Sequence, residues 1–317
     1  MTDRITVGIA TCLTGESVRY DGGHKRNAYL MDTLGKFVDF LPVCPESECG
    51  LPIPREAMHL IPPLDHPRLV TVRTGIDHTE RMQQWIEKRL DDLATKNLCG
   101  YVFKTKSPSS GMRDIKIYHE NGKGIVGKGA GLFARAFMER FPLIPVEDEG
   151  RLNDAALREN FIQRVFVYSR WLNFIQCDFN MKGLINFHTH HKLLIMAHAP
   201  RKVSELGRIV SQHESLDLQQ RADLYFKHLM ETLKLIATVK KNVNVLQHIQ
   251  GYFKKNLHSD EKQELNEVIS AYHQGWTPLI VPVTLLQHYV RRYNQPYLKT
   301  QIYLYPHPPE LMLRNHV

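Results

Sequence analysis

Two cysteines and two glutamates lie within six residues, in the segment Cys44-Pro-Glu-Ser-Glu-Cys49. The segment follows an apolar run, residues 37–43, that is typical of a strand, so thiols and carboxylates gather where a strand meets a loop. Another thiol, Cys12, follows the strand-like run 5–11. Soft sulfur ligands at strand ends predict a metal or iron–sulfur site with acids close by. Such a site would make the protein an enzyme whose chemistry lies in the first third of the chain.

The order of strands and loops separates the five cysteines. If the strands are parallel, the loops that follow them lie on one edge of the sheet and converge. Cys99 precedes its strand, and a rise of ~3.3 Å per residue puts it ~20 Å from that edge. Cys177 lies in the second half of the chain. The candidate metal ligands are therefore Cys12, Cys44 and Cys49.

Three thiols leave two interpretations open. A structural zinc site has four ligands, and the chain has no Cys-x-x-Cys pair, so zinc is disfavoured. An iron–sulfur cluster held by three cysteines leaves one position free for a substrate atom, and Pro45 follows Cys44 as proline often follows a ligating cysteine. The alternative is a set of loop thiols without a cluster. Glu46 and Glu48 are the local acids that could act as general acid or base.

Short polar segments at the other strand ends could bind a substrate. The residues concerned are Arg19, Asp21, Lys25 and Arg26 after the first strand, and Ser107, Ser109 and Ser110 in a Ser-Pro-Ser-Ser-Gly turn. Basic side chains and serine hydroxyls suit a phosphate or a base carbonyl. Segments of this composition are also common as plain turns.

The 317 residues are enough for two domains. Strand-like and helix-like patterns alternate in the first half, which predicts an α/β domain over residues 1–148 with an open, mostly parallel, Rossmann-like sheet. Its expected strands are 5–10, 37–43, 69–72, 101–103 and 143–146, and its expected helices are 25–34, 80–93 and 131–141. The acidic stretch 146–154 is the expected linker.

The second domain, residues 149–317, is expected to be all-α. Its predicted helices are 155–174, 192–198, 203–211, 216–254 and 259–274. Strand signals return only in the Pro-rich stretch 293–309.

All the excess positive charge lies in the second half. Residues 151–317 contain 21 Lys+Arg and 13 Asp+Glu, a net charge of +8, whereas residues 1–150 are neutral. A basic half predicts an acidic macromolecular partner, most often nucleic acid, although a solvated basic surface is the alternative. The candidate RNA-binding residues are Lys240, Lys241, Lys254, Lys255, Arg291 and Arg292, with Tyr252, Phe253, Tyr289 and Tyr293 as nearby stacking faces. We expect the four histidines between residues 188 and 198 to pack or contact RNA rather than bind metal.

Cysteine number and hydropathy indicate a compartment. Five irregularly spaced cysteines do not form a disulfide framework, so no disulfide-linked partner is expected. The chain has no apolar run of ~18 residues and no signal-peptide pattern at its start. We therefore expect a cytoplasmic protein without a membrane partner.

Several segments carry a resemblance to known families. They are Cys-Leu-Thr-Gly (12–15), Val-Arg-Tyr-Asp-Gly-Gly-His-Lys-Arg (18–26), Val-Cys-Pro-Glu (43–46), Gly-Leu-Pro-Ile-Pro-Arg (50–55) and Lys-Ser-Pro-Ser-Ser-Gly (106–111). Together they resemble the TudS-like thiouracil desulfidase family. The second half resembles the YbgA family through Phe187-His-Thr-His-His-Lys192, Ala197-His-Ala-Pro200 and Gln247-His-Ile-Gln-Gly-Tyr-Phe-Lys-Lys255. The two halves together resemble the RudS-type tRNA 4-thiouridine desulfidases.

The resemblance implies a [4Fe-4S] cluster held by three cysteines. Its free iron would bind the sulfur of a thiocarbonyl while water replaces that sulfur at the carbon, without net redox change. Cys12 and Cys44 match the first two ligands of the family. Single-domain members have a cysteine where this chain has Ser110, so Cys49 is expected to be the third ligand. The same mapping makes Glu46 the acid/base and Ser107 a group that orients the substrate.

The expected activity is removal of sulfur from 4-thiouridine in tRNA. One alternative is a desulfidase of free thiopyrimidine bases or nucleosides, with the helical half serving dimerisation or solubility, and a homodimer is possible. Another is a non-catalytic RNA-binding protein whose thiols hold no cluster.

Overall fold

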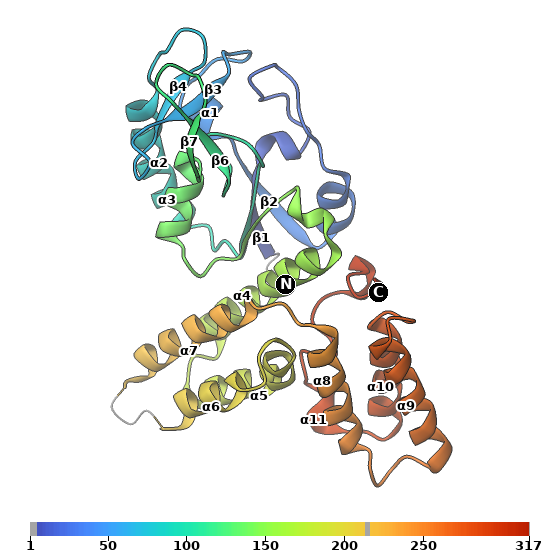
Figure 1. The fold of residues 1–317 in the computed structure, drawn as a ribbon. Helices are drawn as coiled ribbons and strands as arrows, with labels where there is room; N and C mark the ends of the chain where they lie inside the picture. Colours follow the sequence, from blue (N-terminus) through green and yellow to red (C-terminus); the bar gives the residue numbers. More distant parts are fainter. Residues whose placement is uncertain (1–4, 213–215, 317) are drawn as a thin grey trace. The chain divides into compact units, whose positions relative to one another are not determined.

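The computed structural model describes residues 5–212 and 216–316. The chain divides into two compact units between Asp154 and Ala155. The boundary expected from the sequence was six residues earlier, after residue 148. Every strand of the described residues lies in the first unit, and the second unit is helical (Figure 1). The predicted fold class is confirmed.

The central sheet of the first unit is parallel throughout. Its strand order is β2-β1-β5-β8, and the strands are β1 (Ile5–Ala10), β2 (Val38–Val43), β5 (Gly100–Phe103) and β8 (Val146–Asp148). All three neighbouring pairs are parallel, so the loops after these strands leave from one edge. The stretch 146–154, expected as a linker, therefore begins with a strand of this sheet, and Glu147 and Asp148 are buried in it.

A second, mixed sheet was not predicted. Its order is β4-β3-β6-β7, and its strands are β3 (Met58–Ile61), β4 (Arg68–Thr71), β6 (Ile115–Tyr118) and β7 (Ile125–Gly129). The expected strand 69–72 belongs here, antiparallel to β3, and not in the parallel sheet. These strands are only four or five residues long, which gives a weak pattern in sequence.

Three helices pack on the first unit: α1 (Pro45–Glu48), α2 (Thr79–Ala94) and α3 (Leu132–Arg140). The core beneath them is aromatic, and the buried Tyr101 ring lies 4.4–5.7 Å from those of Phe103, Phe133 and Phe137. The helix expected over 25–34 forms only in part, from residue 28 onward. It consists of a π-helix (Tyr29–Thr33) and a 3-10 helix (Leu34–Lys36), and it does not begin earlier because the Lys25 and Asn27 amides donate to the carbonyls of Cys12 and Leu13.

The second unit consists of eight helices among the described residues. They are α4 (Ala155–Cys177), α5 (Met181–His198), α6 (Lys202–Gln212), α7 (Leu218–Leu233), α8 (Val239–Tyr252), α9 (Ser259–His273), α10 (Ile280–Arg292) and α11 (Pro296–Lys299). The single helix expected over 216–254 is two helices, because Thr238 accepts a hydrogen bond from the Lys241 amide and starts α8. The strand signal in 293–309 is also wrong, since that stretch contains α11 and turns. No helix of the described residues is long and apolar enough to cross a bilayer.

Candidate active site

A cavity of about 370 Å³ opens at the carboxyl edge of the parallel sheet. The segments that follow β1, β2 and β5 all line it, as the strand-end argument predicts. Its lining consists of residues 10–12, 18–20, 43–46 and 104–110, together with Arg55, Ala57 and Met58. The cavity thus combines thiols, one carboxylate, serine hydroxyls and basic side chains.

The serine loop after β5 rests on the start of α3. The Leu132 and Ala134 amides donate to the carbonyls of Pro108 and Ser109, at 3.3 and 3.2 Å. Gly131 permits this approach, because a Cβ at that position would lie 2.5 Å from the Ser109 carbonyl oxygen. The loop is therefore fixed from behind while its hydroxyls face the cavity.

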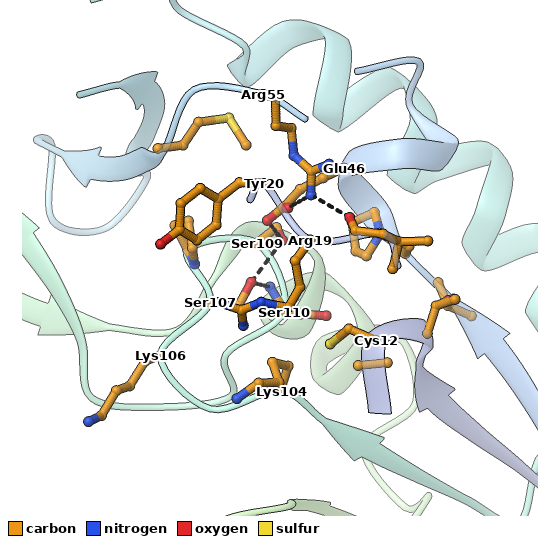
Figure 2. A pocket seen from close by; sticks show the side chains of 18 of the residues that line it. Cys12, Arg19, Tyr20, Glu46, Arg55, Lys104, Lys106, Ser107, Ser109 and Ser110 are labelled. Atoms are coloured by element: carbon orange, nitrogen blue, oxygen red, sulfur yellow. Dashed lines mark hydrogen bonds and ion pairs between the residues drawn. The ribbon is translucent and has the colours of Figure 1, made fainter. Parts of the chain in front are cut away.

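Glu46 is held from two sides. Ser109 Oγ donates to Glu46 Oε1 at 2.8 Å, and the Arg55 guanidinium pairs with Oε2 (Figure 2). Arg55 is only 4% exposed and also donates to the Val18 carbonyl at 3.0 Å. Ser107 Oγ lies 3.1 Å from Ser109 Oγ, which extends the polar chain along the wall. The carboxylate is thus oriented and charge-compensated at the cavity wall.

The other acid of the segment has a different role. Glu48 accepts a hydrogen bond from the Cys44 amide at 2.8 Å and pairs with Arg89 of α2 at 3.2 Å. Burial raises its pKa, while the Cys44 amide lowers it. Glu48 does not line the cavity, so the geometry favours Glu46 over Glu48.

Two of the predicted ligands, Cys12 and Cys44, line the cavity together. Burial raises the pKa of Cys12 from 9.0 to about 11; the Lys104 charge opposes this rise and the neighbouring Cys44 adds to it. Ser110 lines the same cavity, and its buried Oγ has no hydrogen-bond partner among the described residues. Two thiols and an unpartnered buried hydroxyl in one cavity fit a sulfur-ligated metal group.

Cys49 does not line this cavity. Its thiol lies 3.3 Å from the Glu46 carbonyl oxygen and packs against the apolar core of the first unit. No group of three His, Cys, Asp or Glu side chains suited to a metal ion occurs in residues 5–212 and 216–316. The expected role of Cys49 as the third ligand stays a prediction. Cys99 lies at the amino edge of the sheet, as expected, where its amide donates to the Thr6 carbonyl.

Of the four basic-loop candidates, Arg19 alone lines the cavity. Its guanidinium pairs with Asp21 and lies 5.5 Å from the Tyr20 ring centroid. Lys25 and Arg26 lie outside the lining, and Arg26 pairs with Asp32. Substrate contacts of Asp21, Lys25 and Arg26 stay predictions.

Each half of the chain matches a known protein family. The family described as 2-thiouracil desulfurase matches residues 7–149, and a family of unknown function, DUF1722, matches residues 192–308. The uncharacterized protein YbgA of Escherichia coli (strain K12) is 31% identical over 134 residues, which cover 42% of this chain and 79% of that protein. The chain belongs to the TudS-like 2-thiouracil desulfurases fused to a YbgA-like domain. A solved structure titled [4Fe-4S]-dependent thiouracil desulfidase TudS is 29% identical and covers 49% of this chain and 97% of its own, with a TM-score of 0.39.

Sequence reasoning missed two basic residues of the TudS-like domain. Arg55 lies in the Gly-Leu-Pro-Ile-Pro-Arg segment that carried the resemblance, yet nothing in that pattern says that it reaches Glu46. Lys104 pairs with Glu149, beyond β8, and thereby ties two strand ends together beside Cys12. Glu149 is 45 residues from Lys104, and Glu46 is only nine residues from Arg55, but neither pair has a spacing pattern that predicts the contact.

The predicted RNA-binding residues of the YbgA-like domain differ in their exposure and in their contacts. Lys240, Lys254, Lys255 and Arg291 are exposed. Lys241 is half-buried and donates to the carbonyls of His198 and Ile236, at 2.6 and 3.1 Å, so it caps the end of α5 and binds the loop before α8. Arg292 pairs with Glu261.

The expected stacking faces also differ. Phe253 and Tyr289 belong to the core, whereas Tyr252 is exposed and stacks on Tyr297.

Three of the four histidines of α5 pack in the interior, one of the two roles expected of them, whereas His190 is half-buried. His188 lies 3.2 Å from the Tyr225 hydroxyl, and His191 lies 2.7 Å from the Phe187 carbonyl. His198 contacts Gln163 at 2.7 Å. Burial lowers the pKa values of His188, His191 and His198 to about 4, 3 and 4, so all three are neutral at neutral pH.

Proposed function

We propose that the protein removes the sulfur of 4-thiouridine in tRNA with the help of a [4Fe-4S] cluster. The carbon–sulfur double bond is replaced by a carbon–oxygen double bond from water, and hydrogen sulfide leaves, so atoms balance without an oxidant or reductant. The observation that carries the proposal is that Glu46, compensated by Arg55 and Ser109, shares one cavity with Cys12 and Cys44.

Cys12 and Cys44 would hold the cluster, with Cys49 as the predicted third ligand. When bound, the cluster supplies a Lewis-acidic iron with an affinity for sulfur. The remaining steps fall to this chain's side chains. Glu46 takes a proton from the attacking water and returns it to the departing sulfur, while Ser107 and Arg19 orient the base.

The charge of the second domain supports tRNA as the substrate. The net charge of +8 lies in residues 151–317, and five of the six predicted contact residues are exposed there, although Arg292 pairs with Glu261. Polyanion binding of this kind weakens steeply with salt.

The decisive experiment combines composition and activity. Protein reconstituted without oxygen is expected to contain iron and sulfide and to release sulfide from thiolated tRNA. Glu46→Gln should lower the rate about 10²- to 10⁴-fold at unchanged iron content. Glu48→Gln is the matched control, since Glu48 lies on the same short helix outside the cavity, and it should keep most of the rate.

Two results would refute parts of the proposal. If the reconstituted protein contains no iron and sulfide, the alternative of a non-catalytic RNA-binding protein would be favoured. Activity on free 4-thiouridine together with no tRNA binding at low salt would favour a desulfidase of free bases.

A further inference from the structure

A second cavity, of about 680 Å³, lies on the mixed sheet of the TudS-like domain. Met58, Lys106 and Pro108 line both this cavity and the active-site cavity, so the two cavities are adjacent. We call the second cavity the sheet groove. Figure 2 shows Lys106 extending away from Glu46 and Ser109, from the serine loop outward. An RNA strand whose base lies at Glu46 could therefore extend past Lys106 onto β3 and β6.

An aromatic pair lines the sheet groove. His59 of β3 and Tyr118 of β6 stack with ring centroids 5.2 Å apart and an interplanar angle of 23°. Both side chains are half-buried, and burial lowers the pKa of His59, which keeps its ring neutral. A neutral stacked pair at a groove wall offers a face on which a nucleobase stacks.

Three lysines accompany this pair. Lys106 and Lys116 line the groove, and Lys128 of β7 lies directly opposite Lys116 in the antiparallel ladder, so both project from the same sheet face. All three are exposed, and none has an ion-pair partner in residues 5–212 and 216–316. Asp114 is the acid among the lining residues, which leaves the groove and its rim net positive.

We propose that the sheet groove binds the RNA nucleotides that flank the thiolated base, with phosphates at the lysines and a base stacked on the His59–Tyr118 pair. The inference rests on the proposed function, since it concerns the same substrate at the same site. Stacking faces beside a positive track are the features that bind single-stranded nucleic acid. A free base would occupy only the active-site cavity and, unlike an RNA strand, would not contact the sheet groove. The first domain thus contributes RNA contacts of its own, in addition to the basic second domain.

The test measures tRNA binding, which requires no cluster and no turnover. Tyr118→Ala in the full chain should weaken the binding of thiolated tRNA about tenfold, the typical effect of losing one stacked base. Tyr118→Phe keeps the aromatic face and should bind like wild type. Lys116→Ala with Lys128→Ala should lower the slope of log affinity against log salt by about 1.4–1.8, for two lost phosphate contacts. Lys88→Ala, on α2 and lining neither cavity, is the matched control.

The two substrates separate this inference from the proposed function. The Tyr118 and lysine variants should keep the wild-type kcat/KM on free 4-thiouridine. If Tyr118→Ala and the lysine variant both bind tRNA within twofold of wild type, the proposal that the groove binds RNA is refuted, whatever the activity. A wild-type protein that binds tRNA through the groove but releases no sulfide would refute the desulfidase and leave the groove standing.

Discussion

Ser109 and Glu46 are 63 residues apart in sequence, yet the Ser109 hydroxyl donates to Glu46 Oε1 at 2.8 Å. One residue follows β5 and the other follows β2, and β1 lies between these strands in the sheet. Arg55 binds the second carboxylate oxygen. The acid is therefore held by two loops whose positions depend on the parallel sheet.

Replacement of Arg55 should act through Glu46. Arg55→Ala leaves the carboxylate without its cation and free to turn, so the desulfuration rate should fall about 10- to 100-fold. Arg55→Lys should recover part of this loss, because an ammonium keeps the charge but cannot bridge Glu46 and the Val18 carbonyl as a guanidinium does. Single-turnover rates at equal iron content measure the effect. Arg89→Ala, which removes the partner of Glu48, is the control, and an equal loss there would show that α1 is merely destabilised.

Iron content decides the third ligand. Cys49→Ser should prevent cluster assembly and Cys99→Ser should not, since Cys99 lies at the opposite edge of the sheet. Ser110→Ala supplies the contrast, because the Ser110 hydroxyl is buried without a partner in the cavity. Iron and sulfide per chain, measured after anaerobic reconstitution, give the answer. If Ser110→Ala loses iron while Cys49→Ser keeps it, the ligand assignment from the family resemblance is wrong.

The YbgA-like domain should lose stability in acid. His188, His191 and His198 have folded-state pKa values of about 4, 3 and 4, below the ordinary value of 6.5. The unfolded chain binds more protons below that value, so the stability is fully present above pH 6.5 and falls as the pH decreases toward the folded-state values. The loss from pH 6.5 to about pH 5 should be roughly 2 kcal/mol per histidine.

Thermal unfolding followed by circular dichroism at several pH values measures this loss. His198→Gln should reduce the pH dependence by about one proton. His228→Gln, at an exposed histidine of α7, is the control for the substitution itself. A melting temperature that is constant between about pH 7 and pH 5 would contradict the buried histidines as its source.

The parallel sheet should tolerate no side chain at position 8. A Cβ on Gly8 of β1 would lie 2.2 Å from a ring carbon of Tyr101, which is fully buried. Gly8→Ala should therefore cost about 1–3 kcal/mol of unfolding free energy. Gly251→Ala, in α8 with nothing near the added methyl group, should be neutral or stabilising by up to about 1 kcal/mol. Denaturant titration compares the two, and equal stabilities would refute the packing argument.

The sequence by itself determined the parallel sheet and its functional edge. Apolar strand patterns and helical periodicity are local, and parallel strands bring the residues that follow them to one edge. Cys12, Cys44, Glu46 and the serine loop were therefore predictable as neighbours, and the cavity contains all of them.

Tertiary structure alone decided which side chains meet. Arg55 reaches Glu46, Cys49 packs against the core, Lys241 caps the end of α5 and the short strands of the mixed sheet pair up. None of these outcomes has a recognisable sequence pattern, because each depends on how the folded segments pack and on the burial that the packing creates. Periodicity says which face of an element is apolar, whereas the partner of a polar side chain is set by what the completed fold places against it.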